Sequence, residues 1–517
     1  MQGTKQFTDK EVTRFRLSER VPTHNFYRRL AKLVDWGFLY QETQTLYSHT
    51  GQPSLDPVVF FKLALVGRLE NLVSDRRLVE HCALRLDILY FLGYEVDEDL
   101  PWHSTISRTR QLYPTALFER LFDHVFAQCV AHGLVAGDTQ AVDSAPVKAN
   151  ASLYSLREKQ PLEAIVPRMQ LATEAEPAAP SQPAAPSQPA AAILDTPAHV
   201  LRRVATRQDR HRTGHFGSKR PRARLVSNKT HYSPSDPEAR ISIKLGKARA
   251  LNYLCSMAVD TAHGVISHVQ ADLADNRDCA HLPQLVTHLQ QRLLAQGLPL
   301  QDLVADTNYS TGVNYALLEQ QGITAWIPVF GKYKPAVEGF PYDAQADCFT
   351  CPAGKLLPFR SYETSLDGGL FKTYRASTRD CRLCPRKAIC APKTTKRKVT
   401  RTAYDPHYRR ALARQQSRQG HRMRLVRQST VEPVFGSLLQ HYGLRQVSTR
   451  GRASAHKTML LAAMAYNLKK LLKYRPQQQP GLAVALPKPP PLPPTGLFQR
   501  GTTGHQLPNR FNSQEET

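Results

Sequence analysis

Three acidic residues on well-separated segments are the side chains of this chain best suited to chemistry. Asp143 follows a short β-tolerant segment, Asp306 follows the apolar run Leu303-Val-Ala, and Glu432 lies in a helical pattern. We expect each aspartate at a strand end facing a cleft, with Pro146 stopping the first strand because proline cannot donate to a sheet ladder. A single aspartate of this kind usually caps a turn or is solvated. Three acids on three elements, however, are what a pair of Mg²⁺ ions requires.

The helical spacing around Glu432 gives a second argument for a ligand role. Glu432 shares a predicted helical face with Phe435, Gly436 and Leu439, which turns its carboxylate towards the protein. Acidic side chains are rarely buried unless they are paired or bind a metal ion. This position therefore favours a ligand over an ordinary surface glutamate.

Cysteines form a second group with metal-ligand spacing. Cys348 and Cys351 make one Cys-x-x-Cys pair, and Cys381 and Cys384 make another after 29 intervening residues. Two such pairs are typical of a structural Zn²⁺ site, in which thiolates bind the ion tetrahedrally. Reduced thiols or redox pairs are the alternatives, and Cys390 is a spare thiol that could replace one of the four.

Composition indicates a protein that binds a polyanion. The 517 residues carry a formal net charge of +26, which favours nucleic acid as the partner. The charge is spread along the chain rather than gathered on one amphipathic helix, so an anionic membrane surface fits less well. The length allows two to four domains.

Several compartments are disfavoured by the sequence. No run of 18 uncharged apolar residues could span a membrane, and the first residues lack the apolar core of a secretory signal. Nine cysteines, several of them clustered, argue against a secreted disulfide framework. We therefore expect a cytoplasmic, nucleoid-associated protein with no membrane partner.

The first 130 residues read as an all-α domain. Ser54 and Pro57 are typical of a helix start, further helices are expected at 74–83 and 86–92, and His103 opens another that exposes Arg108 and Arg110. Short helices that end on a basic helix suggest a helix-turn-helix-like DNA reader. The alternative is a plain helical bundle with solvated charges.

The middle of the chain alternates strands and helices. Strands are expected at 251–259, 265–270, 303–306 and 323–330, and helices at 281–298 and 312–321. This order predicts a mixed α/β layer. A Pro/Ala repeat at 177–189 should be a mobile linker, and the arginine-rich run after it is either a phosphate-binding track or a disordered basic loop.

Five segments together resemble the DDE transposases of bacterial insertion sequences. They are Val142-Asp-Ser, Val304-Ala-Asp-Thr-Asn-Tyr-Ser310, Thr430-Val-Glu-Pro-Val-Phe-Gly436, Gly443-Leu-Arg445 and Ala465-Tyr-Asn-Leu-Lys469. The helical N-terminal part and the cysteine module are also similar to those of one branch of that family. The resemblance implies an α/β, ribonuclease-H-like mixed sheet flanked by helices, with Asp143, Asp306 and Glu432 binding Mg²⁺ or Mn²⁺.

The resemblance also implies a domain order. It gives a DNA-binding domain at 1–130, the first catalytic strand at 131–150, a largely disordered linker at 151–235 and the rest of the ribonuclease-H-like core at 236–335. A cysteine-rich insertion at 336–400, catalytic helices at 401–475 and a disordered tail at 476–517 complete the chain.

The implied reaction is phosphodiester cleavage at the transposon ends, followed by attack of the freed 3′-hydroxyl on target DNA. The implied assembly is a homodimer in the synaptic complex. Lys148 and Arg427 are candidate phosphate contacts. Relatives carry a basic residue after the glutamate, but Leu439 stands there, so Arg445 is the candidate replacement. A regulator that binds DNA without cutting it, and a ribonuclease-H-like nuclease, remain the alternatives.

Overall fold

Helices account for the regular structure of the N-terminal part. The computed structural model describes residues 14–47, 54–159, 226–242, 249–331, 333–364 and 369–474, all within one compact unit that ends at Tyr474. The Pro/Ala repeat, the arginine-rich run and the tail lie outside these residues. The first helices are α1 (Leu17–Arg20), α2 (Phe26–Leu33), α3 (Phe38–Thr43), α4 (Pro57–Leu69), α5 (Asp75–Ala83), α6 (Leu86–Leu92), α7 (His103–Leu112) and α8 (Thr115–Ala131).

The start of α4 differs from the prediction by two residues. Asp56, not Ser54, is the N-cap, and its carboxylate accepts hydrogen bonds from the backbone N–H groups of Val58 (2.6 Å) and Val59 (3.2 Å). Pro57 occupies the first helical position, where its missing N–H costs nothing. The residue directly before it must therefore be the cap.

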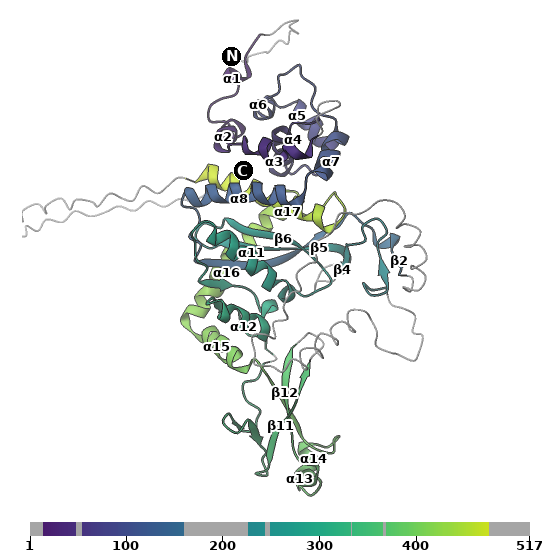
Figure 1. Cartoon of the computed structure of the whole chain (residues 1–517), viewed down its shortest axis with the longest axis vertical. Coiled ribbons are helices and arrows are strands. Elements are labelled where there is room, and N and C mark those ends of the chain that lie inside the picture. Colours follow the sequence, from purple (N-terminus) through teal and green to yellow (C-terminus); the bar gives the residue numbers. More distant parts are fainter. Residues whose placement is uncertain are drawn as a thin grey trace, which may run out of the picture. The chain divides into compact units, whose positions relative to one another are not determined.

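A six-stranded mixed sheet forms the centre of the α/β part (Figure 1). Three strands are long enough to build its antiparallel half, with β1 antiparallel to β5 and β5 antiparallel to β6. On the other side β1 pairs parallel with β7, and β7 pairs parallel with β8. The strands are β1 (Thr139–Lys148), β4 (Arg240–Ser242), β5 (Ala250–Asp260), β6 (Ile266–Leu273), β7 (Asp302–Val304) and β8 (Thr324–Trp326).

The expectation that Pro146 ends the first strand was wrong. Pro146 lies opposite Leu254 within the β1–β5 pairing, which continues to Lys148. The Lys148 N–H donates away from β5 to Arg445 O, so by alternation the Pro146 nitrogen also faces away from β5. Because β7 ends at Val304, that edge of β1 carries no ladder at Pro146, and the missing donor is tolerated as on an edge strand.

Helices from distant parts of the chain cover the sheet. The helix α17 packs against β6, α8 and α4, and α8 and α17 lie side by side in Figure 1. The helix α16 contacts β1, and α11 contacts β6. Their bounds are α11 (Leu282–Leu294), α12 (Gly312–Gln320), α15 (Asp405–Gln416), α16 (Arg418–His441) and α17 (Arg452–Lys473). Among the described residues, no helix is both long and apolar enough to cross a membrane.

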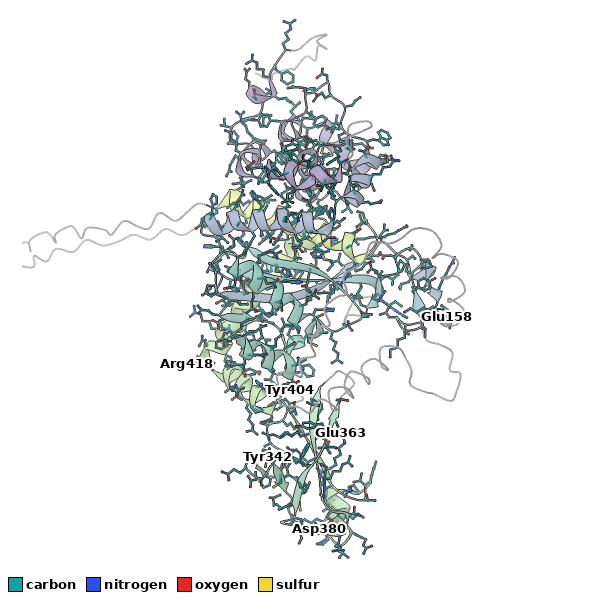
Figure 2. All side chains as sticks on the ribbon, in the orientation of Figure 1. Glu158, Tyr342, Glu363, Asp380, Tyr404 and Arg418 are labelled. Carbon is teal, nitrogen blue, oxygen red and sulfur yellow. The ribbon has the colours of Figure 1, made fainter. Side chains whose placement is uncertain are left out.

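A separate small core lies between α12 and α15 in the sequence. Its five-stranded antiparallel sheet has the order β13-β12-β11-β10-β9, and Tyr342 and Glu363 of this sheet are labelled in Figure 2. The elements are β9 (Tyr342–Asp343), β10 (Cys348–Thr350), β11 (Leu356–Thr364), β12 (Leu370–Arg375), α13 (Thr378–Arg382), α14 (Lys387–Cys390) and β13 (Lys398–Thr402). Phe349, Leu357 and Tyr374 form its centre, apart from the main core. We call residues 342–402 the insert.

The two ends of the predicted linker are ordered. A two-stranded sheet pairs β2 (Arg157–Glu158) with β3 (His231–Tyr232), and Lys159 Nζ donates to Asn228 O (2.7 Å). The segment expected at 151–235 therefore begins and ends in neighbouring strands.

Candidate active site

Asp143 lies on β1, and Asp306 lies two residues after the end of the parallel strand β7. Ala141 of β1 pairs with Val304 of β7, which is the last pair of this register. Asp143 lies inside β1 rather than at its end, whereas Asp306 follows the end of β7 as predicted.

The backbone after β7 orients Asp306. Asp306 caps the short 3₁₀ helix Thr307–Tyr309, and its carboxylate accepts hydrogen bonds from Asn308 N (2.9 Å) and Asn308 Nδ2 (3.0 Å). These bonds hold the carboxylate in one orientation.

Arg427 joins the other two acids. Its guanidinium lies 3.2 Å from Asp143 Oδ2 through Nη1 and 3.1 Å from Glu432 Oε1 through Nη2. The Arg427 side chain is only 12 % exposed, so this cation is held between a strand and a helix rather than in solvent. Arg427 thus connects two of the three predicted acids, Asp143 and Glu432.

The exposure of Glu432 differs from the prediction. The buried face of α16 is formed by Val431, Val434, Phe435 and Leu438, whereas the Glu432 side chain is 58 % exposed. The predicted stripe was rotated by one residue, about 100° around the helix axis. Glu432 consequently projects from the rim of the buried face.

A buried phenol lies beside the acids. Tyr309 OH is 2.6 Å from Ser144 Oγ, which in turn donates to Ser256 Oγ (2.9 Å). Burial raises the pKa of Tyr309 well above its ordinary value, and the negative charges of Asp143, Asp278 and Asp306 raise it further. Sequence reasoning missed this hydrogen-bonded chain, although Ser144 and Tyr309 stand within the two aspartate motifs.

A cleft of about 1860 Å³ opens beside this group. Pro146 of β1 lines it, together with Asp278 and Asn308 of two short 3₁₀ helices, and Tyr342 and Phe371 line it from the insert. Asn308 is the residue that holds Asp306, so the cleft extends to the neighbour of one predicted acid.

The donor set suits a hard divalent cation, because carboxylate oxygens are the ligands Mg²⁺ prefers. Among the described residues, however, no group of three or more His, Cys, Asp or Glu side chains is arranged to hold a metal ion. Arg427 instead supplies the positive charge between Asp143 and Glu432. The residue types fit the metal expected from the sequence, and an arginine joins two of the three acids, Asp143 and Glu432.

Two predicted DNA contacts are neighbours. Val447 N donates to Lys148 O (2.9 Å) and Lys148 N donates to Arg445 O (3.1 Å), so the loop after α16 extends the edge of β1. The side chains of Lys148 and Arg445 are both exposed. Gly443 enters this loop with a φ of 66°, a left-handed conformation that suits glycine.

The two arginines of α7 differ from each other. Arg108 is exposed, as expected. The expectation that Arg110 is also exposed was wrong, because its guanidinium makes two hydrogen bonds to Asp75 of α5 (2.7 and 2.9 Å) and only 14 % of the side chain is exposed. The sequence could not reveal this partner, which lies 35 residues away.

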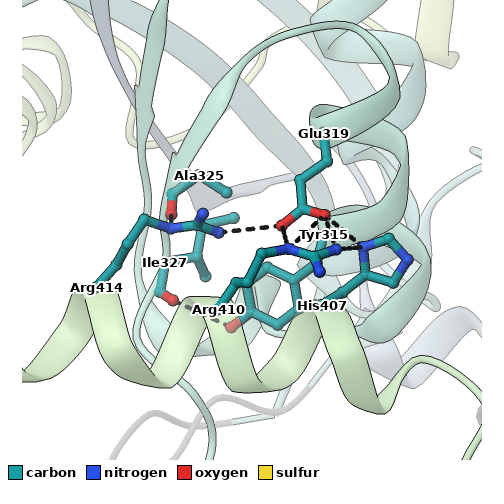
Figure 3. Close-up of polar contacts among 7 residues, drawn as sticks. All are labelled: Tyr315, Glu319, Ala325, Ile327, His407, Arg410 and Arg414. Carbon is teal, nitrogen blue, oxygen red and sulfur yellow. Dashed lines mark hydrogen bonds and ion pairs between the residues drawn. The ribbon is translucent and has the colours of Figure 1, made fainter.

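An ion network fixes the helix that leads into α16. Figure 3 shows His407, Arg410 and Arg414 of α15 gathered around Glu319 of α12. Arg414 also donates to the backbone carbonyl of Ala325 in β8 (3.1 Å). Burial raises the pKa of the Glu319 carboxyl, but hydrogen bonds from Arg410 and His407 outweigh it and hold that pKa at about 2.

The cysteines of the insert are free thiols. Cys348 is buried in β10, while Cys351, Cys381 and Cys390 pack against the small core of the insert. The Lys355 N–H donates to Cys351 Sγ at 3.4 Å. The structure thus places three of the thiols around one apolar cluster without a metal-holding arrangement among the described residues.

Comparison with known proteins gives two matches. Residues 15–112 match a family model described as a transposase domain (DUF772), and residues 350–472 match one described as a transposase DDE domain. No curated protein and no solved structure matches the chain. Glu432 lies within the second match, whereas Asp143 and Asp306 lie between the two.

The matches define the class of protein. The chain is a DDE transposase of the insertion-sequence type, a class of enzymes that cut DNA and transfer strands with the help of divalent metal ions. Its partner is therefore DNA.

Proposed function

We propose that this transposase binds the terminal inverted repeats of an insertion sequence, cleaves there and joins the freed 3′ end to target DNA. Asp143, Asp306 and Glu432 would form the metal-binding triad of a ribonuclease-H-like core. The main support is the guanidinium shared by Asp143 and Glu432, together with the parallel pairing of β1 with β7, which ends two residues before Asp306. The sheet, with the antiparallel strands β4, β5, β6 and β1 joined to the parallel strands β7 and β8, is compatible with this core.

The acids would hold Mg²⁺ or Mn²⁺. Such ions, when bound, activate the attacking oxygen and neutralise the charge that develops on the leaving oxygen. Asp306 presents a carboxylate that Asn308 already orients, which lowers the entropy lost on binding. Arg427 lies between the other two acids and can turn to a DNA phosphate when they bind cations. No side-chain nucleophile is required.

DNA would be held by residues outside the triad. Lys148 and Arg445 lie together at the end of β1, where a phosphate backbone approaching the acids would meet them. Arg108 of α7 is exposed for contacts made by the N-terminal helices. Such contacts release counterions, so affinity should fall steeply with salt.

The triad predicts the outcome of conservative substitutions. Asp143→Asn, Asp306→Asn and Glu432→Gln should each reduce cleavage of a supercoiled plasmid carrying the terminal repeats by at least about a thousandfold, because each removes a charged oxygen ligand. Binding of the end DNA in EDTA should stay close to that of the wild type. Asp97→Asn, which changes an exposed acid of the loop between α6 and α7, is the matched control.

Retained cleavage in any of the three variants removes that residue from the triad. Two alternative functions give other patterns. A regulator binds the repeats but nicks no plasmid in Mg²⁺, and a ribonuclease-H-like nuclease cuts equally well without the repeats.

We also propose that the enzyme acts on nucleoid DNA as a homodimer, so that two transposon ends are cut in one complex. Light scattering of the protein with end DNA measures this stoichiometry.

Zinc binding by Cys348, Cys351, Cys381 and Cys384 is a further proposal, supported by their spacing. Cys390 packs on the same core as Cys351 and Cys381 and is the alternative fourth ligand. Elemental analysis of the purified protein, with each cysteine changed to serine, identifies the ligands through lost zinc.

A further inference from the structure

The outer part of the insert carries an unusual combination of side chains. We call residues 377–396, which contain α13 and α14, the insert tip. Leu383 and Ile389 in this tip are 77 % and 89 % exposed. Both side chains belong to the same short tip, six residues apart in the sequence.

Positive charge surrounds these two side chains. The tip carries six basic residues and a single acid, Asp380, which Figure 2 labels. Four of the basic side chains are exposed and make no ion pair with any residue that the structure describes: Arg379, Arg382, Arg386 and Lys393. Their charge is therefore available to a polyanion.

The tip is held in place from below. Cys381 and Cys390 pack against the core of the insert, and Ala391 is buried. Arg397 donates to Cys390 O (2.8 Å) and lies over the Phe340 ring, 5.0 Å from its centroid. Ser377 caps α13 by accepting a hydrogen bond from Arg379 N (3.2 Å). Leu383 and Ile389 consequently project from a fixed platform.

This arrangement favours DNA over a protein as the occupant. Two aliphatic side chains offer far less apolar area than the roughly 1,000 Å² of a specific protein interface. Proteins that bend DNA commonly insert Leu or Ile between base steps in the minor groove while Arg and Lys contact the backbone. The charge and the isolated apolar side chains of the tip match that pattern.

We propose that the insert tip binds duplex DNA, with its arginines on the phosphate backbone and Leu383 and Ile389 wedged between base steps so that the duplex bends. This rests on the proposed function in that the duplex is the DNA of the transposition reaction. The contact is separate from the acidic triad and from the N-terminal helices.

The test uses the full-length protein in EDTA, with a duplex carrying one terminal repeat, a fluorophore at each end and 2-aminopurine at successive positions. Leu383→Ala/Ile389→Ala should keep the affinity within about threefold, restore the end-to-end distance of free DNA and abolish the 2-aminopurine increase that reports unstacking. Both side chains are exposed, so their removal leaves no cavity; the single substitutions serve if the double variant folds poorly. Leu294→Ala, which removes a 65 % exposed leucine of α11, should behave as the wild type.

The charge variant separates the two contributions. Arg379→Gln/Arg382→Gln/Arg386→Gln should weaken binding and lower the slope of log affinity against log salt by about two to three, because each lost phosphate contact removes about 0.9. If the Leu383→Ala/Ile389→Ala variant bends DNA as the wild type does, or if the wild-type complex contains no bend, the insertion of these side chains between base steps is excluded. An unchanged salt slope in the charge variant overturns the DNA contact, and tip-dependent self-association without DNA would assign the surface to a second copy.

These outcomes are independent of the proposed cleavage. Tip-dependent bending by a protein that never cuts in Mg²⁺ leaves this inference standing and removes the proposed function. If cleavage requires Asp143 but the DNA bends equally with the wild-type and the variant tip, the proposed function stands and this inference is wrong.

Discussion

Arg427 is the residue that most changes how the acidic group is understood. Its two ion pairs bring together a strand carboxylate and a helix carboxylate that would otherwise repel each other. One guanidinium offsets part of the repulsion between the two carboxylates. An arginine here acts as an internal counter-ion, which divalent cations must compete with or displace.

Replacing this counter-ion should strengthen metal binding. We expect Arg427→Gln to bind Mn²⁺ about fivefold more tightly without DNA, since a partly exposed ion pair contributes up to about 1 kcal/mol. Titration calorimetry measures the affinity directly. Arg424→Gln on the same helix, where the side chain is exposed, is the control. Unchanged or weaker Mn²⁺ binding by Arg427→Gln would show that the arginine does not compete with the ion.

At this scale the sequence supplies residue types but not their partners. The aspartate and glutamate motifs could be recognised because each is a short, contiguous stretch of sequence. The contact between Arg427 and Asp143 spans 284 positions, and that between Arg110 and Asp75 spans 35, so both depend on tertiary packing. Tyr309 was overlooked for the same reason, because only the folded structure shows its buried hydrogen bond to Ser144.

At the scale of elements, α17 is the helix that the sheet depends on. Met459–Leu472 was predicted to be core, and nearly all of this stretch is buried. Its one fully buried polar side chain is Asn467, which accepts a hydrogen bond from Ile266 N and donates one to Ile266 O, both at 2.9 Å. The asparagine thus takes the place of a neighbouring strand at the start of β6.

Asn467→Ala should destabilise the protein by about 1–3 kcal/mol, because it leaves a buried N–H and a buried C=O without partners. Urea unfolding followed by tryptophan fluorescence measures the loss, with the exposed Asn276→Ala as control. An equal stability of the two variants would mean that water or another group satisfies Ile266.

The ion network between α12 and α15 predicts that the stability of the protein depends on pH (Figure 3). The pKa of Glu319 is about 2 in the folded protein, below its ordinary value of 4.5. Between these pH values the unfolded chain therefore binds more protons than the folded protein. The stabilisation that the Glu319 carboxylate contributes is complete above about pH 4.5 and is lost as the pH falls towards 2. We expect Glu319→Gln to be less stable than the wild type at pH 6, with the difference shrinking by pH 3. Thermal melts at both pH values, with Glu338→Gln alongside, test the trend; a constant difference would exclude this carboxylate as its source.

Element types followed from the sequence better than element ends. The 86–92 helix was predicted with its observed bounds, and the 251–259 and 265–270 strands do form a hairpin. The strand expected at 323–330 shrank to Thr324–Trp326, because Pro328 lacks a backbone donor. The unpaired edge beside Pro146 could not be foreseen, since it depends on where β7 stops.

At the scale of the molecule, the N-terminal helices share one continuous apolar core with the sheet. Polar contacts reinforce it: Arg68 donates to Gly443 O (3.1 Å), and Lys457 donates to the backbone carbonyls of Arg110 and Tyr113. The insert has a core of its own. Among the described residues, the main core and the core of the insert are therefore the two large apolar clusters, and a third, small cluster contains Ala316, Leu370 and Tyr404.

Calorimetry should resolve these two large clusters. Phe118→Ala in α8 should lower the temperature of the transition in which the N-terminal helices and the main sheet unfold together. Phe349→Ala in β10 should lower only the temperature at which the insert unfolds. Each buried phenylalanine removed costs about 3–5 kcal/mol. Hydrogen exchange that speeds up in β5 as well as in α4 for Phe118→Ala would confirm the shared core. Exchange that changes in the N-terminal helices alone would contradict it.

The pairing of β2 with β3 has a practical consequence. Lys159 and Asn228, on either side of a long excursion of the chain, are joined by a hydrogen bond, so the excursion departs and returns at one place. Doubling the length of such a loop adds only about 0.6 kcal/mol to its closure cost. Insertions or deletions between Lys159 and Asn228 should therefore change the stability of the protein little. A fluorescent protein inserted there should leave the candidate active site unchanged.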